Sequence, residues 1–238
     1  EKLHTRQIWR HTFHHLRLRH MGKAKKIDAQ LTERFSRSAS RERRIGVRDL
    51  KVFFLIVCEG AKTEPNYFKS FPAQVGEFVY DLQFGGGGIS TLKVVEEAIR
   101  IRDNSKQKFD RVWAVFDKDS FRPVEFNAAI EKAIQNRVEC AWSNEAFELW
   151  YLQHFQFRNT PMSRIDSAEA INNAVNDQLK ATSFRYRKND VGMYHVLQKS
   201  GNEEGAIRNA RKLHGYHEGA TYSDPHPCTT VYKLIEQR

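Results

Sequence analysis

The chain has 238 residues, a formal net charge of +10 and an apolar fraction of 40%, which suit one large domain or a domain with an appendage. No apolar run approaches the roughly 20 residues of a membrane-spanning helix, and the N-terminal stretch shows no signal-peptide core. The three cysteines are widely spaced without a CxxC pair, which argues against a disulfide scaffold or zinc finger and favours a reducing, cytoplasmic location.

The positive charge is concentrated near the N-terminus. Residues 1–50 contain 14 Lys and Arg against 5 Asp and Glu, whereas the remainder is nearly neutral. We expect a basic arm over residues 1–50 that binds nucleic-acid phosphates; a solvated or partner-docking segment is the alternative. Met21 resembles a natural start, so residues 1–20 could be a non-native extension. The expected nucleic-acid contacts are Lys23, Lys25, Lys26, Arg41, Arg43, Arg44 and, beyond the arm, Lys62.

Strand and helix patterns alternate after the arm. Short runs rich in β-branched and aromatic residues predict buried strands at 51–58, 78–84, 111–116 and 138–142. Apolar positions at helical spacing predict intervening helices at 65–71, 91–102 and 124–136. This order favours an α/β fold, with a parallel four-stranded sheet flanked by helices over residues 51–143. The four glycines at 85–88 lack the Lys-Ser/Thr of a phosphate-binding loop and predict a flexible turn.

The strand patterns stop after Trp142. Helices are predicted at 145–154, 167–179, 192–198, 203–214 and 229–237. We expect residues 144–238 to form a C-terminal helical cap that packs on the core and closes over the carboxyl edge of the sheet.

Three acidic residues follow two of the predicted strands. Glu59 follows the first strand, and Asp117 and Asp119 follow the third, so all three are expected in the crevice at the carboxyl edge of the sheet. Carboxylates this close repel each other unless a cation lies among them, and Mg²⁺ (or Mn²⁺) prefers such ligands. Asp117 and Asp119 would reach one metal while the chain is extended. The pattern predicts a metal-dependent phosphoryl-transfer enzyme; helix caps or surface acids are the alternative.

Further candidates surround this trio. Glu59 is expected to be a metal ligand or the general acid/base, and Glu64 a second ligand or an acid favoured near a helix N-terminus. Glu148 would supply another ligand or an acid/base, unless it forms a salt bridge to an Arg of the cap. Lys188 would contact the scissile phosphate as a point charge, or be a solvated lysine at a helix start.

Several strings resemble the RloB-like family, whose members are found beside restriction and abortive-infection genes. The longest is FLIVCEGAKTEPNYF from Phe54 to Phe68. The others, in order, are Phe116–Asp119, Ser143–Trp150, Tyr186–Lys188 and Thr229–Leu234. That family is similar to the Toprim superfamily, whose nucleases and topoisomerases use a Glu after the first strand and Asp-x-Asp after the third.

The resemblance implies a Toprim-like, Rossmann-like fold and a Mg²⁺-dependent nuclease in antiphage defence or abortive infection. Glu59, Asp117 and Asp119 occupy the places of the superfamily's motif. Toprim nucleases of the overcoming-lysogenization-defect class often carry another acid four residues after the first Glu; here that position is Thr63, and Glu64 comes one later. The chain has no ATP-binding motif, so a separately encoded ATPase is an expected partner.

Two other readings stay open at this point. The chain could be a non-catalytic nucleic-acid-binding or scaffold subunit of an ATPase-containing defence complex, with acids that hold a structural metal. It could also be a Toprim-type phosphotransferase that acts on a nucleotide. The sequence leaves open whether the nucleic acid is DNA or RNA.

Overall fold

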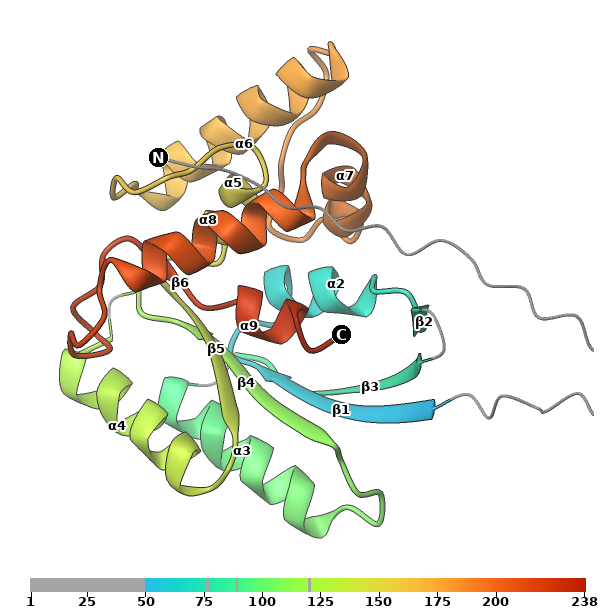
Figure 1. Cartoon of the computed structure of the whole chain (residues 1–238), viewed down its shortest axis with the longest axis vertical. Helices are drawn as coiled ribbons and strands as arrows, with labels where there is room; N and C mark the ends of the chain where they lie inside the picture. Colours follow the sequence, from blue (N-terminus) through green and yellow to red (C-terminus); the bar gives the residue numbers. More distant parts are fainter. Residues whose placement is uncertain (1–49, 76–77, 89, 120) are drawn as a thin grey trace, which may run out of the picture. The chain divides into compact units, whose positions relative to one another are not determined.

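A computed structural model describes residues 50–75, 78–88, 90–119 and 121–238. Its centre is a six-stranded sheet in the order β2-β3-β1-β4-β5-β6 (Figure 1). The strands are β1 (Leu50–Cys58), β2 (Gln74–Val75), β3 (Phe78–Gly86), β4 (Arg111–Asp117), β5 (Glu139–Asn144) and β6 (Cys228–Thr229). The α/β class is confirmed, and all four expected strands are present.

The expected four-stranded parallel sheet is incorrect as a description of the whole sheet, which is mixed. β3, β1, β4 and β5 pair in parallel. β2 pairs antiparallel with β3 at one edge, and β6 pairs antiparallel with β5 at the other. Both added strands have only two residues, so they carry no alternation that a sequence pattern could reveal.

The helices are α2 (Thr63–Lys69), α3 (Thr91–Asn104), α4 (Pro123–Gln135), α5 (Glu148–Gln153), α6 (Arg164–Leu179), α7 (Met193–Ser200), α8 (Glu203–Gly215) and α9 (Tyr232–Ile235). The expected helix at 229–237 is wrong at its start, where Thr229 belongs to β6, and only α9 is helical there. The one expected at 145–154 begins later, at Glu148. None of the described helices combines the length and apolar character needed to cross a membrane.

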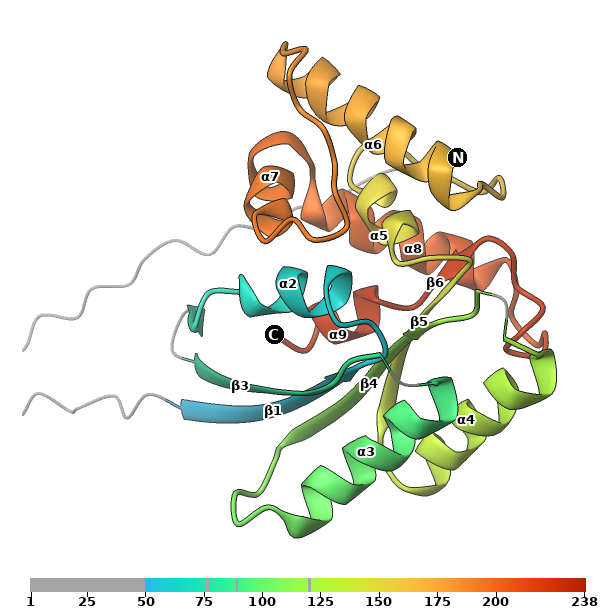
Figure 2. The same cartoon turned by 180° about the vertical axis from the view of Figure 1, so that it is seen from behind.

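The two faces of the sheet are covered by different helices. α3 and α4 lie on one face, and α2 and α9 lie on the other (Figures 1 and 2). Leu55 and Val57 of β1 pack in the cluster that includes α3 and α4, whereas Phe54 and Ile56 pack in the cluster that includes α2 and α5. Burial on both faces explains why β1 is continuously apolar from Val52 to Cys58.

Gly85 and Gly86 belong to β3, which corrects the expected flexible turn for two of the four glycines at 85–88. They pair with Val57 and Cys58 of β1. Gly86 has φ 82°, and a Cβ there would lie 2.3 Å from the Cys58 carbonyl oxygen. The glycine therefore lets β3 approach the end of β1 immediately before Glu59.

An aromatic cluster joins α2 to the C-terminal helices. The Tyr67 ring packs on Phe147, Tyr151 and Tyr194 at centroid distances of 5.5–5.7 Å. Its hydroxyl accepts a hydrogen bond from the Trp150 Nε1–H at 2.9 Å. This packing fixes α2 and α5 against each other and so sets the positions of the acids that they carry.

Candidate active site

A pocket of about 590 Å³ lies at the carboxyl ends of β1 and β4. It is lined by the acids Glu59, Glu64, Asp117, Asp119 and Glu148 and by the bases Lys62, Arg164 and Lys188. A larger hollow of about 1140 Å³ lies at the amino ends of β4 and β5. Ligands of open α/β sheets bind at the carboxyl ends, so the smaller, acidic pocket is the candidate site.

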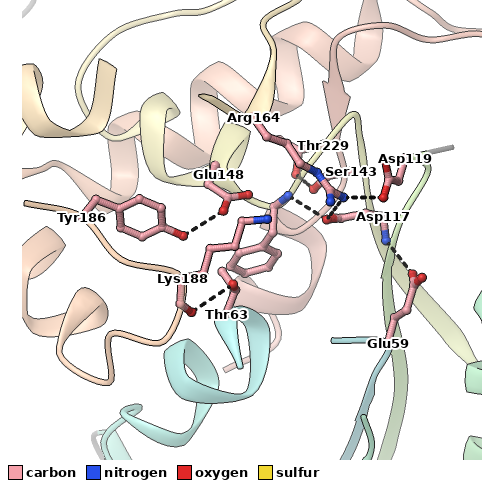
Figure 3. A network of polar contacts seen from close by, with 11 residues as sticks. Glu59, Thr63, Asp117, Asp119, Ser143, Glu148, Arg164, Tyr186, Lys188 and Thr229 are labelled. Carbon is pink, nitrogen blue, oxygen red and sulfur yellow. Dashed lines mark hydrogen bonds and ion pairs between the residues drawn. The ribbon is translucent and has the colours of Figure 1, made fainter. Parts of the chain in front are cut away.

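Glu59 is fixed by the ladder between β1 and β4. Its backbone N–H donates to the Val115 carbonyl at 2.9 Å, and its carboxylate Oε2 accepts from the Asp117 N–H at 3.2 Å (Figure 3). Burial raises the pKa of Glu59 to about 7, the hydrogen bond from Asp117 opposes the rise, and the charges of Glu64 and Asp119 add to it. A carboxyl group with this pKa can both accept and release a proton near neutral pH.

Asp117 and Asp119 are brought together, although not by an extended chain. β4 ends at Asp117, and Asp119 has φ 37°, so the extended backbone that was expected to place both carboxylates on one side is not present. Both carboxylates face Arg164, whose Nη2 lies 2.9 Å from Asp119 Oδ2 and 3.7 Å from Asp117 Oδ2. The Phe147 N–H also donates to Asp117 Oδ2, at 3.2 Å. Burial, followed by the charges of Glu64 and Glu148, raises the pKa of Asp117 well above its usual range.

Glu64 lies in the first turn of α2 with its carboxylate buried against the loop after β1. A Cβ at Gly60 would lie 2.4 Å from Glu64 Oε2. Burial raises the pKa of Glu64, a hydrogen bond within its own residue lowers it, and the charge of Glu148 raises it further. The side chain is therefore part of the acidic pocket, and it also lies near the N-terminus of α2 as expected.

Glu148 is buried at the start of α5, and its hydrogen-bond partner is a tyrosine rather than the arginine of the alternative interpretation. The Tyr186 hydroxyl donates to Glu148 Oε1 at 2.8 Å (Figure 3). The hydroxyl pKa of Tyr186 is raised by burial first and then by the Glu148 charge. The Tyr186 hydroxyl thus orients the Glu148 side chain.

The basic candidates divide into two groups. Lys188 lines the pocket and is exposed, and its carbonyl accepts from Thr63 Oγ1 at 3.2 Å. It lies between α6 and α7 rather than at a helix start. Lys62 is exposed at the pocket mouth. The arm residues Lys23, Lys25, Lys26, Arg41, Arg43 and Arg44 lie outside the described part of the chain.

Arg164 and Tyr186 are the site residues that sequence reasoning missed. Tyr186 was noted only within a family string. Arg164 follows Ser163, whose hydroxyl accepts from the Asp166 N–H and caps α6. The Ser-x-x-Asp spacing could have located the helix start, but no local pattern reveals that Arg164 reaches β4.

The donor chemistry of the pocket fits a hard divalent cation, because its acidic ligands are carboxylates alone. Asp117 Oδ1 is buried and makes no hydrogen bond to any described residue, so it is free to accept a ligand. The expected ligand set was Glu59, Glu64, Asp117 and Asp119, but their side chains are not spaced as a ready metal site. The described residues contain no group of three His, Cys, Asp or Glu placed to hold a metal together.

Fold and site together define an α/β protein with an acidic, base-rimmed pocket at the carboxyl edge of its parallel strands. A family model, RloB-like protein, matches residues 54–237, and the chain belongs to this family. The resemblance seen in the sequence strings is thereby confirmed. A search of curated proteins and a search of solved structures each found no match.

Proposed function

We propose that the chain is a metal-dependent nuclease of the Toprim type. The observation that carries this proposal is the convergence of Glu59 with Asp117 and Asp119 at the ends of two adjacent parallel strands. Glu59 comes from the strand β1, and the Asp pair comes from the end of β4, which is the arrangement that the Toprim motif implies. Support also comes from the parallel order of the four long strands.

Asp117 and Asp119, with Glu59 or Glu64, would hold Mg²⁺ or Mn²⁺. When bound, such a cation neutralises the charge that develops on the phosphoryl oxygens. Glu59, with a pKa near 7, is suited to exchange a proton with the attacking water or the leaving oxygen. Lys188 and Lys62, at the pocket lining, are suited to hold phosphates of the nucleic acid as point charges. Glu148, oriented by Tyr186, is the second acid/base candidate.

Cleavage assays on plasmid, single-stranded DNA and tRNA with added Mg²⁺ or Mn²⁺ test the proposal. Glu59→Gln keeps the shape of the side chain but cannot ionise, so we expect the rate to fall by about 10²–10⁴-fold while nucleic acid still binds. Glu131→Gln, on the exposed surface of α4, is the matched control. Wild-type protein that cleaves none of the three substrates would count against the nuclease, and an unchanged rate in Glu59→Gln would remove its assigned role.

A non-catalytic nucleic-acid-binding or scaffold role is the second candidate. It is favoured by the ion pairs of Arg164, which offset part of the charge of Asp117 and Asp119. In this case the protein would bind nucleic acid in EDTA as well as in Mg²⁺, and no cleavage would appear under any metal. The same assay therefore separates the two candidates.

We also propose a role in antiphage defence and an ATPase partner; both are supported only by the kind of genes found beside members of this family. We propose that an ATPase encoded alongside restrains the chain until infection. Sequencing the nucleic-acid ends formed after induction in cells would identify the substrate as DNA or RNA.

A further inference from the structure

Arg164 is a cation of the helical region that reaches into the acidic pocket. It is the first residue of α6, and Ser163 fixes that helix start, because its hydroxyl accepts from the Asp166 N–H at 3.2 Å and donates to Asp166 Oδ2 at 2.7 Å. The side chain leaves this fixed turn and ends between Asp117 and Asp119 (Figure 3).

The charge of Arg164 acts on most of the pocket. It opposes the rise in pKa that burial and mutual repulsion produce at Glu59, Glu64 and Asp117. In a pocket with five acids, this guanidinium performs the electrostatic task that a bound cation would perform. The guanidinium therefore lies where the expected metal would be needed to offset the charge of the acids.

The Arg164 contact is incomplete on both sides. Arg164 Nε and Asp117 Oδ1 are buried, and each lacks a hydrogen-bond partner among the described residues. A paired fork of two parallel hydrogen bonds to one carboxylate would use both groups and would be stronger. The one close ion pair, from Arg164 Nη2 to Asp119 Oδ2 at 2.9 Å, joins two side chains that are each about one-third exposed. The Arg164 side chain can therefore leave the pair without unfolding of the protein.

We propose that Arg164 is an internal competitor of the divalent cation. Without metal its guanidinium pairs with Asp117 and Asp119, and when a metal binds these carboxylates the Arg164 side chain withdraws. The metal itself rests on the proposed function. A divalent cation carries twice the charge and can bring carboxylates closer together than a guanidinium can. The competition accounts for the lack, within the described residues, of a ready group of three metal-binding side chains.

Mn²⁺ titration by calorimetry at pH 8.5, with the full chain, tests the competition. Removing the competitor in Arg164→Gln should tighten Mn²⁺ binding on the order of fivefold, the factor expected from an ion pair at the strong end of the exposed range. Arg164→Lys keeps a charge and should stay near the wild type. Arg208→Gln removes the same charge from an exposed pair on α8 and should leave the affinity unchanged.

The outcomes separate this inference from the function on which it rests. If Mn²⁺ binds the wild type and Asp117→Asn abolishes binding, but Arg164→Gln binds equally or more weakly, the competition is wrong and the metal site survives. If neither the wild type nor Arg164→Gln binds Mn²⁺, the metal site and the competition fail together. An equal gain in Arg208→Gln would reduce the effect to net charge and overturn the competition as well.

A measurement on the wild-type chain keeps the test independent of variant folding. The Nε–H resonance of Arg164, assigned by its loss in Arg164→Lys, should shift as Mg²⁺ is added, with the midpoint of metal binding. A resonance that stays fixed while metal binds would overturn the displacement of the guanidinium.

Discussion

The raised pKa of Glu59 has a consequence for stability that can be measured without a substrate. In the unfolded chain the carboxyl titrates near 4.3, and in the folded protein near 7, so the folded state binds more protons between these values. The stabilising contribution is therefore present in full below about pH 4.3 and is lost as the pH rises through 7. The pKa values of Asp117 and Glu64 are raised as well and act in the same direction.

We predict that Glu59→Gln makes the metal-free protein less sensitive to pH between 5 and 8. The slope that it removes is below about 1.4 kcal/mol per pH unit, the limit for one proton, because Glu59 is partly exposed. Urea unfolding in EDTA at several pH values measures it. Burial lowers the pKa of both His154 and His214 to about 4, which makes stability rise with pH, so the test is the difference between variants.

Glu131→Gln is the control for this measurement, since Glu131 is exposed on α4 and outside the pocket. Its unfolding curve should follow that of the wild type at every pH. Parallel pH profiles for the wild type and Glu59→Gln would show that Glu59 titrates at its ordinary pKa in the folded protein.

At the scale of single residues, the positions of the acidic side chains could be predicted from the sequence, whereas the position of the basic side chain that contacts them could not. Glu59, Asp117 and Asp119 follow apolar runs that are buried on both faces, so their places at strand ends were readable. Arg164 contacts them across the fold, and its position depends on the path of the chain between α5 and α6. A contact of this kind leaves no periodic or compositional trace in the sequence.

At the scale of elements, the long strands and helices were predictable, whereas the shortest elements were not. Residues 52–58 of β1 and 112–116 of β4 are uninterrupted apolar runs because helices cover both faces of the sheet. β6 has two residues and is defined only by its pairing with Ser143 and Asn144. The glycines of β3 predicted a turn because glycine is usual there, yet Gly85 and Gly86 pair with β1.

The edge between β1 and β3 gives a prediction about Gly86. An alanine Cβ would lie 2.3 Å from the Cys58 carbonyl oxygen, and the φ of 82° disfavours any side chain. We expect Gly86→Ala to destabilise the protein by more than about 1–3 kcal/mol, the usual cost of such a backbone conformation alone, because the clash adds to it. Urea unfolding at pH 7 measures the loss.

Gly88 provides the matched control for the clash. It has a similar positive φ of 72°, but a Cβ there would meet nothing within 4 Å. Gly88→Ala therefore carries the backbone strain alone and should cost less than Gly86→Ala. Equal losses would mean that strain explains both and that β3 can move away from β1 without penalty.

At the scale of the whole molecule, charge is divided between two parts of the chain. Residues 1–50 carry nearly all of the net charge of +10, and the remainder is close to neutral. The acidic pocket would by itself repel a polyanion, so binding of nucleic acid requires positive charge from elsewhere. Lys62 and Lys188 at the pocket supply little of it, which makes the basic arm the expected source.

Deletion of residues 1–46 should therefore weaken nucleic-acid binding and flatten its dependence on salt. Each phosphate contact that is lost should reduce the slope of log K against log salt by about 0.9 on duplex DNA. Fluorescence anisotropy with a labelled duplex and a labelled RNA, from 50 to 300 mM NaCl, measures both. Mn²⁺ affinity should be unchanged, because the proposed metal ligands all lie beyond residue 58.

Deletion of residues 1–20 alone distinguishes specific contacts from total charge. This segment carries five Lys and Arg, against nine in residues 21–50. If binding depends on Lys23, Lys25, Lys26, Arg41, Arg43 and Arg44, the shorter deletion should leave the slope nearly intact, while replacing these six with Gln should reproduce the longer deletion. A loss in proportion to the charge removed would instead indicate a diffuse electrostatic attraction. Identical slopes in all forms would leave the arm as a partner-docking or solvated segment and the pocket lining as the nucleic-acid contact.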